Sequence, residues 1–136
     1  MITPKRNANS QRLTILTVVL LFIATWLWWR IFPRSADHVS AKEVGEFTHQ
    51  LSQQMNEGQP LTQSISTLAE KQQNKYFQQV LRKVQSKIIA GNTLSSAMAQ
   101  YPDVFDSNYI RVVSDGEKNA NLDVAIQQLS QKRYSK

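Results

Sequence analysis

The sequence predicts an all-α protein, with an N-terminal transmembrane helix followed by a compact bundle of about six short helices. Three observations lead to this prediction. Residues 13–32 form an almost continuous apolar run, the later apolar residues recur at three- and four-residue spacing, and no stretch alternates with period two long enough to indicate a strand. At 136 residues, the chain can hold at most one ordinary domain plus an appendage.

The first 32 residues divide into a polar tail, residues 1–12, and the predicted anchor, residues 13–32. About 20 residues in a helix would cross a hydrocarbon core of about 30 Å. Arg30 lies near the end of the run, where its long side chain can reach the headgroups. Three tryptophans at the same end match an interfacial aromatic belt: Trp26, Trp28 and Trp29. The alternative is a cleaved signal peptide, but the run is long for one and lacks a convincing cleavage site.

The net charge of +6 is distributed unevenly. Five basic residues flank the apolar run: Lys5, Arg6, Arg12, Arg30 and Arg34. From residue 37 onward, 11 Lys and Arg face 10 Asp and Glu. The positive charge therefore belongs to the anchor, where it suits anionic headgroups. No basic face with interleaved aromatic residues remains, which argues against nucleic-acid binding.

Residues 33–39 are predicted to be a linker, because Pro33 cannot continue the preceding helix. Residues 40–136 then form the helical domain. Ser40 with Glu43 three residues later is a capping box that starts its first helix. Apolar residues follow at helical spacing: Val44, Phe47, Leu51 and Met55.

The later helices are predicted from apolar residues at helical spacing, bounded by glycine or proline. Pro60 suits the first turn of the second helix. The third helix starts near Lys75, the fourth is capped by Thr93, and the fifth covers about residues 107–114. The expected core residues are, in order, Leu61, Ile65 and Leu68; Phe77, Leu81, Val84 and Ile88; Leu94, Ala97 and Met98; Tyr109, Ile110 and Val113; and Leu122, Ile126 and Leu129.

Single glycines are expected at the helix ends, where a positive φ explains them: Gly58, Gly91 and Gly116. Residues 58–65 resemble residues 91–98, at a spacing of 33. Such an echo is compatible with a helical repeat. Because the echo occurs clearly only twice, we favour a helix-turn-helix pattern that is used twice, in which a glycine ends one helix and a leucine begins the next. We favour this interpretation over a solenoid.

Few residues could carry chemistry. The chain has no cysteine, which excludes disulfides, thiolate metal sites and thiol nucleophiles. His38 and His49 have no carboxylate or cysteine at metal-ligand spacing, so no metal or cofactor is expected. No nucleophile elbow or phosphate-binding loop is present, which argues against an enzyme. Three acidic residues cluster near the C-terminus: Asp115, Glu117 and Asp123. We expect the first two to be solvated in a loop and the third to lie in the first turn of the last helix, with an interaction or cation contact as the alternative.

Taken in order, these features resemble the soluble helical domain of the inner-membrane F-type platform proteins of type II secretion and type IV pilus assembly. The resemblance covers roughly residues 44–133. It rests on an ordered series of motifs: Phe47-Thr48-His49-Gln50-Leu51, Gly58-Gln59-Pro60-Leu61, Ile88-Ile89-Ala90-Gly91, Leu94-Ser95-Ser96-Ala97-Met98, Pro102-Asp103-Val104-Phe105, Gly116-Glu117 and Asn121-Leu122. Ala120 departs from the family pattern, which has a second glycine there. This sequence shows one helical domain and one predicted membrane span. Family members usually have two such domains and about three membrane spans.

The resemblance implies a non-enzymatic, membrane-anchored component or accessory of such a platform, acting by protein–protein interaction. The implied partners are inner-membrane lipids, other inner-membrane proteins of the machine, an assembly ATPase and a second copy of the chain. Nine family-motif residues are interaction candidates: Gly58, Leu61, Gly91, Leu94, Pro102, Phe105, Gly116, Glu117 and Leu122.

The membrane orientation follows from the resemblance rather than from charge. Three basic residues lie on each flank of the anchor, so the positive-inside rule gives a tie. The family implies a bacterial inner-membrane protein with a cytoplasmic domain. The alternative is a periplasm-facing, membrane-anchored domain with a chaperone or sensor role.

Overall fold

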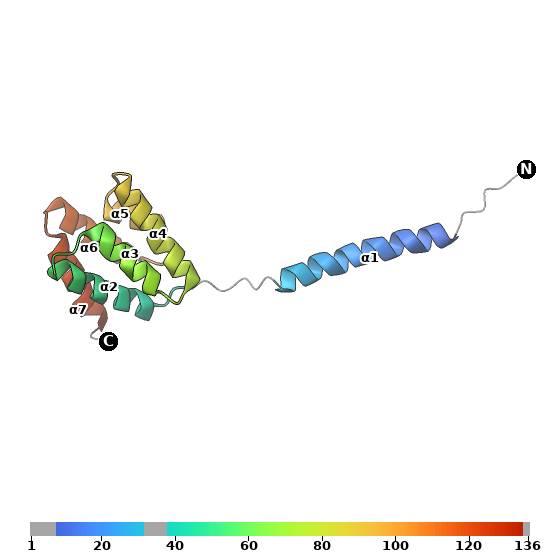
Figure 1. Ribbon diagram of the computed structural model, residues 1–136, viewed down its shortest axis with the longest axis horizontal. Coiled ribbons are helices and arrows are strands. Elements are labelled where there is room, and N and C mark those ends of the chain that lie inside the picture. Colours follow the sequence, from blue (N-terminus) through green and yellow to red (C-terminus); the bar gives the residue numbers. More distant parts are fainter. Residues whose placement is uncertain (1–7, 32–37, 135–136) are drawn as a thin grey trace, which may run out of the picture. The chain divides into compact units, whose positions relative to one another are not determined.

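The computed structural model describes residues 8–31 and 38–134, and within these ranges the chain forms seven helices and no strand (Figure 1). The all-α prediction is therefore confirmed. The contacts divide the chain into two units, residues 1–36 and 37–136. Most of the predicted tail and linker lies outside the described residues, as do the side chains of Trp29 and Arg30.

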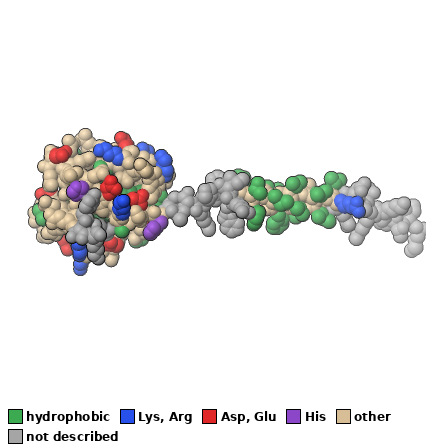
Figure 2. All heavy atoms as spheres, turned by 90° about the horizontal axis from the view of Figure 1, so that it is seen from below, with side chains coloured by type: hydrophobic (Ala, Val, Ile, Leu, Met, Phe, Trp, Pro, Cys, Tyr) green, Lys and Arg blue, Asp and Glu red, His purple; other side chains and the backbone are tan. Residues whose placement is uncertain are grey.

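The first unit contains one helix, α1 (Ala8–Ile31), of 24 residues. Apolar side chains cover its described part and are exposed; Phe22, for example, is 73% exposed (Figure 2). The Thr17 and Thr25 hydroxyls donate hydrogen bonds to carbonyl oxygens one turn earlier, at 2.8 and 2.9 Å. Among the described residues, no helix combines the length and the apolar character that a membrane span requires.

The second unit is a bundle of six helices that closes into a ring. These are α2 (Ala41–Asn56), α3 (Leu61–Lys71), α4 (Lys75–Ile89), α5 (Leu94–Met98), α6 (Ser107–Lys118) and α7 (Leu122–Tyr134). Each helix packs against the next in the chain, and α7 packs against α2. The predicted number of bundle helices is confirmed. The two echoed segments both prove to be a turn followed by a helix start, within a closed ring rather than an open stack.

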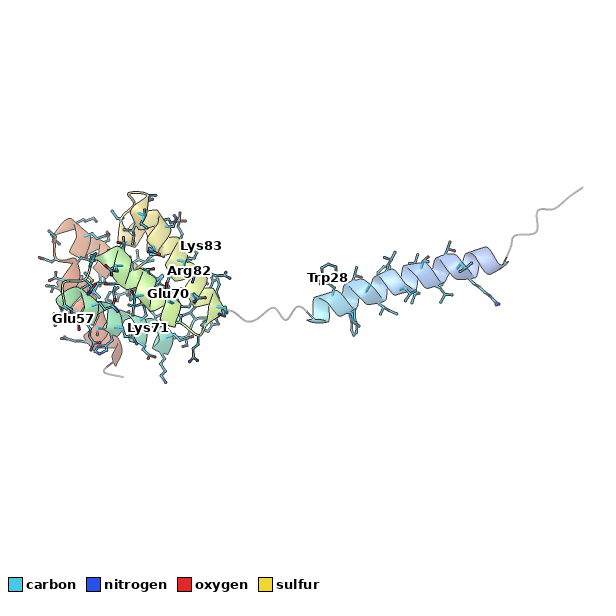
Figure 3. All side chains as sticks on the ribbon, in the orientation of Figure 1. Trp28, Glu57, Glu70, Lys71, Arg82 and Lys83 are labelled. Atoms are coloured by element: carbon cyan, nitrogen blue, oxygen red, sulfur yellow. The ribbon has the colours of Figure 1, made fainter. Side chains whose placement is uncertain are left out.

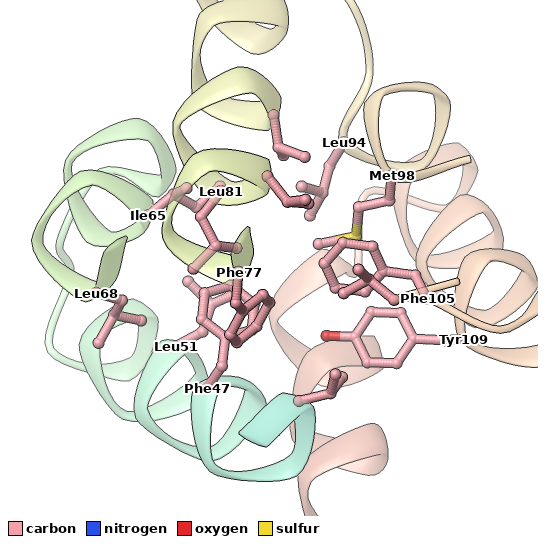
Figure 4. Packing of buried hydrophobic residues seen from close by; sticks show 14 of the residues in the cluster. Phe47, Leu51, Ile65, Leu68, Phe77, Leu81, Leu94, Met98, Phe105 and Tyr109 are labelled. Carbon is pink, nitrogen blue, oxygen red and sulfur yellow. The ribbon is translucent and has the colours of Figure 1, made fainter. Parts of the chain in front are cut away.

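Aromatic side chains from four parts of the chain meet at the centre of the ring (Figure 4). Phe47 of α2 meets Phe77 of α4 edge-on, with 5.6 Å between ring centroids. The ring centroid of Phe105 lies 6.4 Å from that of Phe77 and 5.4 Å from that of Tyr109. The Tyr109 hydroxyl is 2.9 Å from the Thr48 hydroxyl on α2, which provides a polar partner within the apolar core.

The predicted apolar stripes form this core. Most of their residues are fully buried, and five pack against the core from partly buried positions: Met55, Leu61, Ile88, Ile110 and Leu122. The capping box is also confirmed, because the Ser40 hydroxyl accepts from the Glu43 amide at 3.2 Å while the Glu43 carboxylate accepts from the Ser40 amide at 2.7 Å. Pro60 is the N-cap of α3, one residue before the predicted first turn.

The prediction for Gly116 was wrong. The fifth bundle helix was expected to end near Ser114, but α6 continues to Lys118 and Gly116 lies inside it. Positive φ angles occur instead at Gly58 (80°), Gly91 (96°) and Ala120 (54°). The helix therefore ends where Ala120 adopts the left-handed conformation, four residues after the glycine that was expected to end it.

Candidate interaction site at the junction of α5, α6 and α7

Glu117 connects the last turn of α6 to the start of α5. One carboxylate oxygen accepts a hydrogen bond from the Leu94 amide at 2.5 Å. The other accepts from the Ser95 amide at 3.2 Å and from the Ser95 hydroxyl at 2.5 Å. Leu94 and Ser95 are the first two residues of α5, whose amides have no partner within that helix. Glu117 therefore caps a helix that lies 22 to 23 residues earlier in the chain.

The cap is completed by Thr93, whose hydroxyl accepts from the Ser96 amide at 3.2 Å. The first three amides of α5 thus have side-chain acceptors. A carboxylate at this position also interacts favourably with the positive end of the helix dipole. Because α5 has only five residues, this capping replaces the stability that a longer helix would gain from its own hydrogen bonds.

The three acidic residues of the predicted cluster do not converge. Glu117 is half-buried within α6, which corrects the expectation of a solvated loop. Asp115 is also helical, although it is exposed, and Asp123 lies in the first turn of α7, as predicted. In the part of the chain that the structure describes, no three His, Cys, Asp or Glu side chains come together as a metal site would require.

Gly116 allows α6 and α7 to approach each other closely. It is buried, and a Cβ atom placed on it would lie 2.5 Å from the Ala125 Cβ. The same atom would lie 3.2 Å from the Asn121 carbonyl oxygen and from the Leu122 Cα. A glycine is therefore favoured here by contact with α7 rather than by backbone conformation.

The turn after α6 is a Schellman motif with Ala120 in the left-handed position. The Ala120 amide donates to the Glu117 carbonyl at 3.3 Å, and the Asn121 amide donates to the Gly116 carbonyl at 2.8 Å. The turns after α2 and α4 have the same bonding pattern, with Gly58 and Gly91 in that position. The structure thus explains why a glycine would suit position 120.

The structure brings together four of the nine predicted residues: Leu94, Gly116, Glu117 and Leu122. The others serve elsewhere. Phe105 is in the aromatic core, Leu61 begins α3, and Pro102 is exposed in the turn before α6. Sequence reasoning missed Ser95 and Ala125 as members of the junction. Ser95 had one signal, its position just inside the start of a short helix; Ala125 had none.

Two further polar contacts position α2. The His49 Nδ1 atom is 3.1 Å from the Ser130 hydroxyl, which joins α2 to α7. Hydrogen bonds from the Ser40 amide and hydroxyl hold the pKa of Glu43 below its ordinary value, and Asn74 and the charge of His38 act in the same direction, against the opposing effect of partial burial. These contacts are structural, since each holds a helix end or a helix pair in place.

Comparison with known proteins places these features in a family. The model of the family "Type II secretion system (T2SS), protein F" matches residues 47–135. Over 92 residues, the chain is 33% identical to the type IV pilus assembly protein PilC of Myxococcus xanthus, covering 68% of this chain and 22% of that protein. It is 30% identical to the type II secretion system protein F of Vibrio cholerae over 92 residues, covering 68% of this chain and 23% of that protein.

A third relative, the type IV pilus assembly protein PilC of Thermus thermophilus, is 26% identical over 89 residues, covering 65% of this chain and 22% of that protein. The chain thus spans less than a quarter of the length of these relatives. The family match includes nearly all of the six-helix ring, from Phe47 of α2 to the end of α7. By this match and by the resemblance in its motifs, the chain belongs to the type II secretion system protein F family.

Proposed function

We propose that this protein is a non-enzymatic, membrane-anchored component or accessory of a type II secretion or type IV pilus assembly platform. The observation that carries the proposal is the family match across residues 47–135. The relatives are named for type II secretion and for type IV pilus assembly. A helical domain of this family is therefore expected to act by binding other proteins of the machine.

The use of polar groups at the junction supports an interaction role over catalysis. The Glu117 carboxylate accepts three hydrogen bonds from the start of α5. A general acid or base must instead keep an oxygen available for the substrate. The cap holds α5 and α6 together and so preserves the shape of the surface that they form.

The proposed anchor is the whole of residues 13–32, in a bacterial inner membrane, with the helical domain in the cytoplasm. The exposed apolar side chains of α1 support it, as do the threonine hydroxyls that bond to the helix backbone. Trp26 and Trp28 are exposed near one end of the segment, as interfacial residues would be. The proposed anchor also includes residues 29–32, whose side chains lie outside the described part of the chain.

The partner proposal is tested by crosslinking the tagged full-length protein in its native cells. We expect recovery of a protein-F-type platform protein, an assembly ATPase or another inner-membrane protein of the machine. A Gly116→Ala variant, with the α6–α7 packing disturbed, serves as the comparison and should recover less. Failure to recover any such protein would contradict the proposal.

The orientation is tested by cysteine labelling, since the chain has no cysteine of its own. Gln127→Cys places a thiol on the exposed side of α7, and Ser10→Cys places one near the N-terminus. In cells with an opened outer membrane, an impermeant maleimide should label Ser10→Cys and spare Gln127→Cys until the inner membrane is permeabilised. The reverse pattern would support the periplasm-facing alternative.

A further inference from the structure

The charged residues of α4 are all basic. The helix contains four basic residues and no acidic residue: Lys75, Arg82, Lys83 and Lys87. The first three are exposed, while Phe77, Val80, Leu81 and Val84 point into the core. Among the described residues, none of the four basic side chains forms an ion pair. We call the exposed surface of residues 75–89 the α4 face.

Carboxylates from other segments lie beside the first turn of α4: the Asp103 carboxylate accepts a hydrogen bond from the Tyr76 hydroxyl at 2.5 Å, and Glu43 interacts with the N-cap residue Asn74. Farther along, α3 contributes one acidic and one basic exposed residue, Glu70 and Lys71 (Figure 3). The short helix α5 contains no charged residue. From residue 37 onward the chain is nearly neutral, with 11 basic and 10 acidic residues. The charge of the α4 face therefore reflects segregation of cations onto one helix rather than an excess of cations in the domain.

An exposed apolar side chain accompanies the charge. Ile89, the last residue of α4, is 70% exposed. At 3.6 residues per turn it falls on the same side of the helix as Lys75, Arg82 and Ser86. Exposed cations are attracted to anionic headgroups, and an exposed apolar side chain can be buried at the membrane interface.

The chain also keeps the helical domain near a membrane if residues 13–32 are the anchor. Only seven residues, 33–39, connect that segment to Ser40, and such a chain reaches at most about 25 Å when extended. α4 begins beside the start of α2, because its N-cap residue Asn74 interacts with Glu43. A short tether gives the domain a high effective concentration at the membrane surface.

We propose that the α4 face docks on the anionic lipid headgroups of the membrane in which the protein is anchored. This inference rests on the proposed anchoring. The domain then lies against the membrane on α4, which leaves α6 and α7 free for protein partners. Each cation near an anionic surface should raise the ratio of docked to undocked domain about fivefold, and salt should weaken this attraction.

The test uses the full-length protein in vesicles. A cysteine introduced by Ser86→Cys lies on the α4 face, and one introduced by Gln127→Cys on α7 is its control. Each carries a fluorophore whose access to an aqueous quencher is measured. In vesicles with about 30% phosphatidylglycerol, we expect the label at position 86 to be shielded and the label at position 127 to remain accessible. Shielding should disappear in neutral phosphatidylcholine, and also in about 1 M salt, where the screening length falls to about 3 Å.

Charge variants make the test specific. The combined change K75Q/R82Q/K83Q, which removes the three exposed cations of α4, should lower the ratio of docked to undocked domain about a hundredfold, at about fivefold for each cation. The matched variant K42Q/K118Q/K132Q removes the same charge from exposed positions on other helices and should leave the shielding intact. Equal loss in both variants would overturn the proposal, as would equal quencher access at position 86 in the two lipids.

Other outcomes distinguish the alternatives. Shielding in neutral vesicles that grows with protein density would indicate a second copy of the chain and overturn the lipid proposal. Shielding in native membranes alone would indicate an acidic protein and also overturn the lipid proposal.

The anchor is tested separately by tryptophan emission, since all three tryptophans lie in residues 26–29. If emission is unchanged by neutral vesicles, the anchoring fails; if it shifts to the blue and position 86 stays accessible in phosphatidylglycerol, only the docking fails.

Discussion

Glu117 accepts a hydrogen bond from the Ser95 hydroxyl at 2.5 Å, and through this contact the end of α6 caps the start of α5. Two residues 22 positions apart in the chain thereby join two helices of the ring. The Gly-Glu step of the family motif thus has two separate structural roles in this protein. Gly116 permits contact with α7, while Glu117 supplies the cap for α5.

Replacing Glu117 by alanine should lower the free energy of unfolding by about 1–2 kcal/mol, the usual cost of losing a helix cap. Two amides and one hydroxyl of α5 lose their acceptor in this variant. The measurement is urea denaturation of the full-length protein followed by circular dichroism. Asp115→Ala, at an exposed position on the same helix, should change stability by no more than about 0.5 kcal/mol. Similar losses in both variants would contradict the capping role.

Replacing Gly116 by alanine should destabilise the protein by about 1–3 kcal/mol, because the new methyl group meets Ala125 at 2.5 Å. The cost of this contact should outweigh the stabilisation of about 1 kcal/mol that alanine gives over glycine in a helix interior, so the variant is less stable than the wild type. Thermal unfolding measures the difference. The double variant G116A/A125G removes the closest contact and should recover part of the loss, since two contacts at 3.2 Å remain. A single variant as stable as the wild type would show that α6 and α7 are not closely packed here.

Replacing Ala120 by glycine should stabilise the protein by about 0.5–1 kcal/mol. The left-handed conformation, with φ of 54°, costs a residue with a Cβ about 1–2 kcal/mol, and the greater freedom of unfolded glycine offsets part of the gain. The expected result is a melting temperature several degrees higher. Ala90→Gly is the matched control, because Ala90 has φ of −73° at the end of α4 and should lose stability on the same change. A gain in both variants would exclude the conformational explanation.

Acid should remove the stability that Glu43 contributes. Its pKa is lowered in the folded protein by the Ser40 amide and hydroxyl, so the contribution is complete above the pKa of the unfolded chain and is lost as the pH falls through the folded value. Glu43→Gln should therefore be less stable than the wild type near pH 7, and the difference should shrink as the pH falls below about 5. Urea denaturation at a series of pH values measures this. Parallel stability curves for the two proteins would contradict the prediction.

The sequence by itself determined the all-α class, the six bundle helices and most of the core. These features depend on signals within one or two helical turns, such as the capping box at Ser40 and Glu43 and the stripe of Phe77, Leu81 and Val84. The turns at Gly58 and Gly91 were predictable for the same reason, since glycine adopts a positive φ at little cost.

Only the tertiary structure decided the roles of Gly116, Glu117 and Ala120. A helical glycine resembles a helix end in sequence until the neighbouring helix is placed against it, and here that helix lies at contact distance. A glutamate 22 residues from the helix that it caps gives no local signal. The contact between Thr48 and Tyr109, 61 residues apart, and the closure of α7 onto α2 likewise depend on how the helices dock. Ala120 adopts a conformation that alanine alone disfavours, in a turn closed by the Schellman hydrogen bonds between two helices that pack against each other.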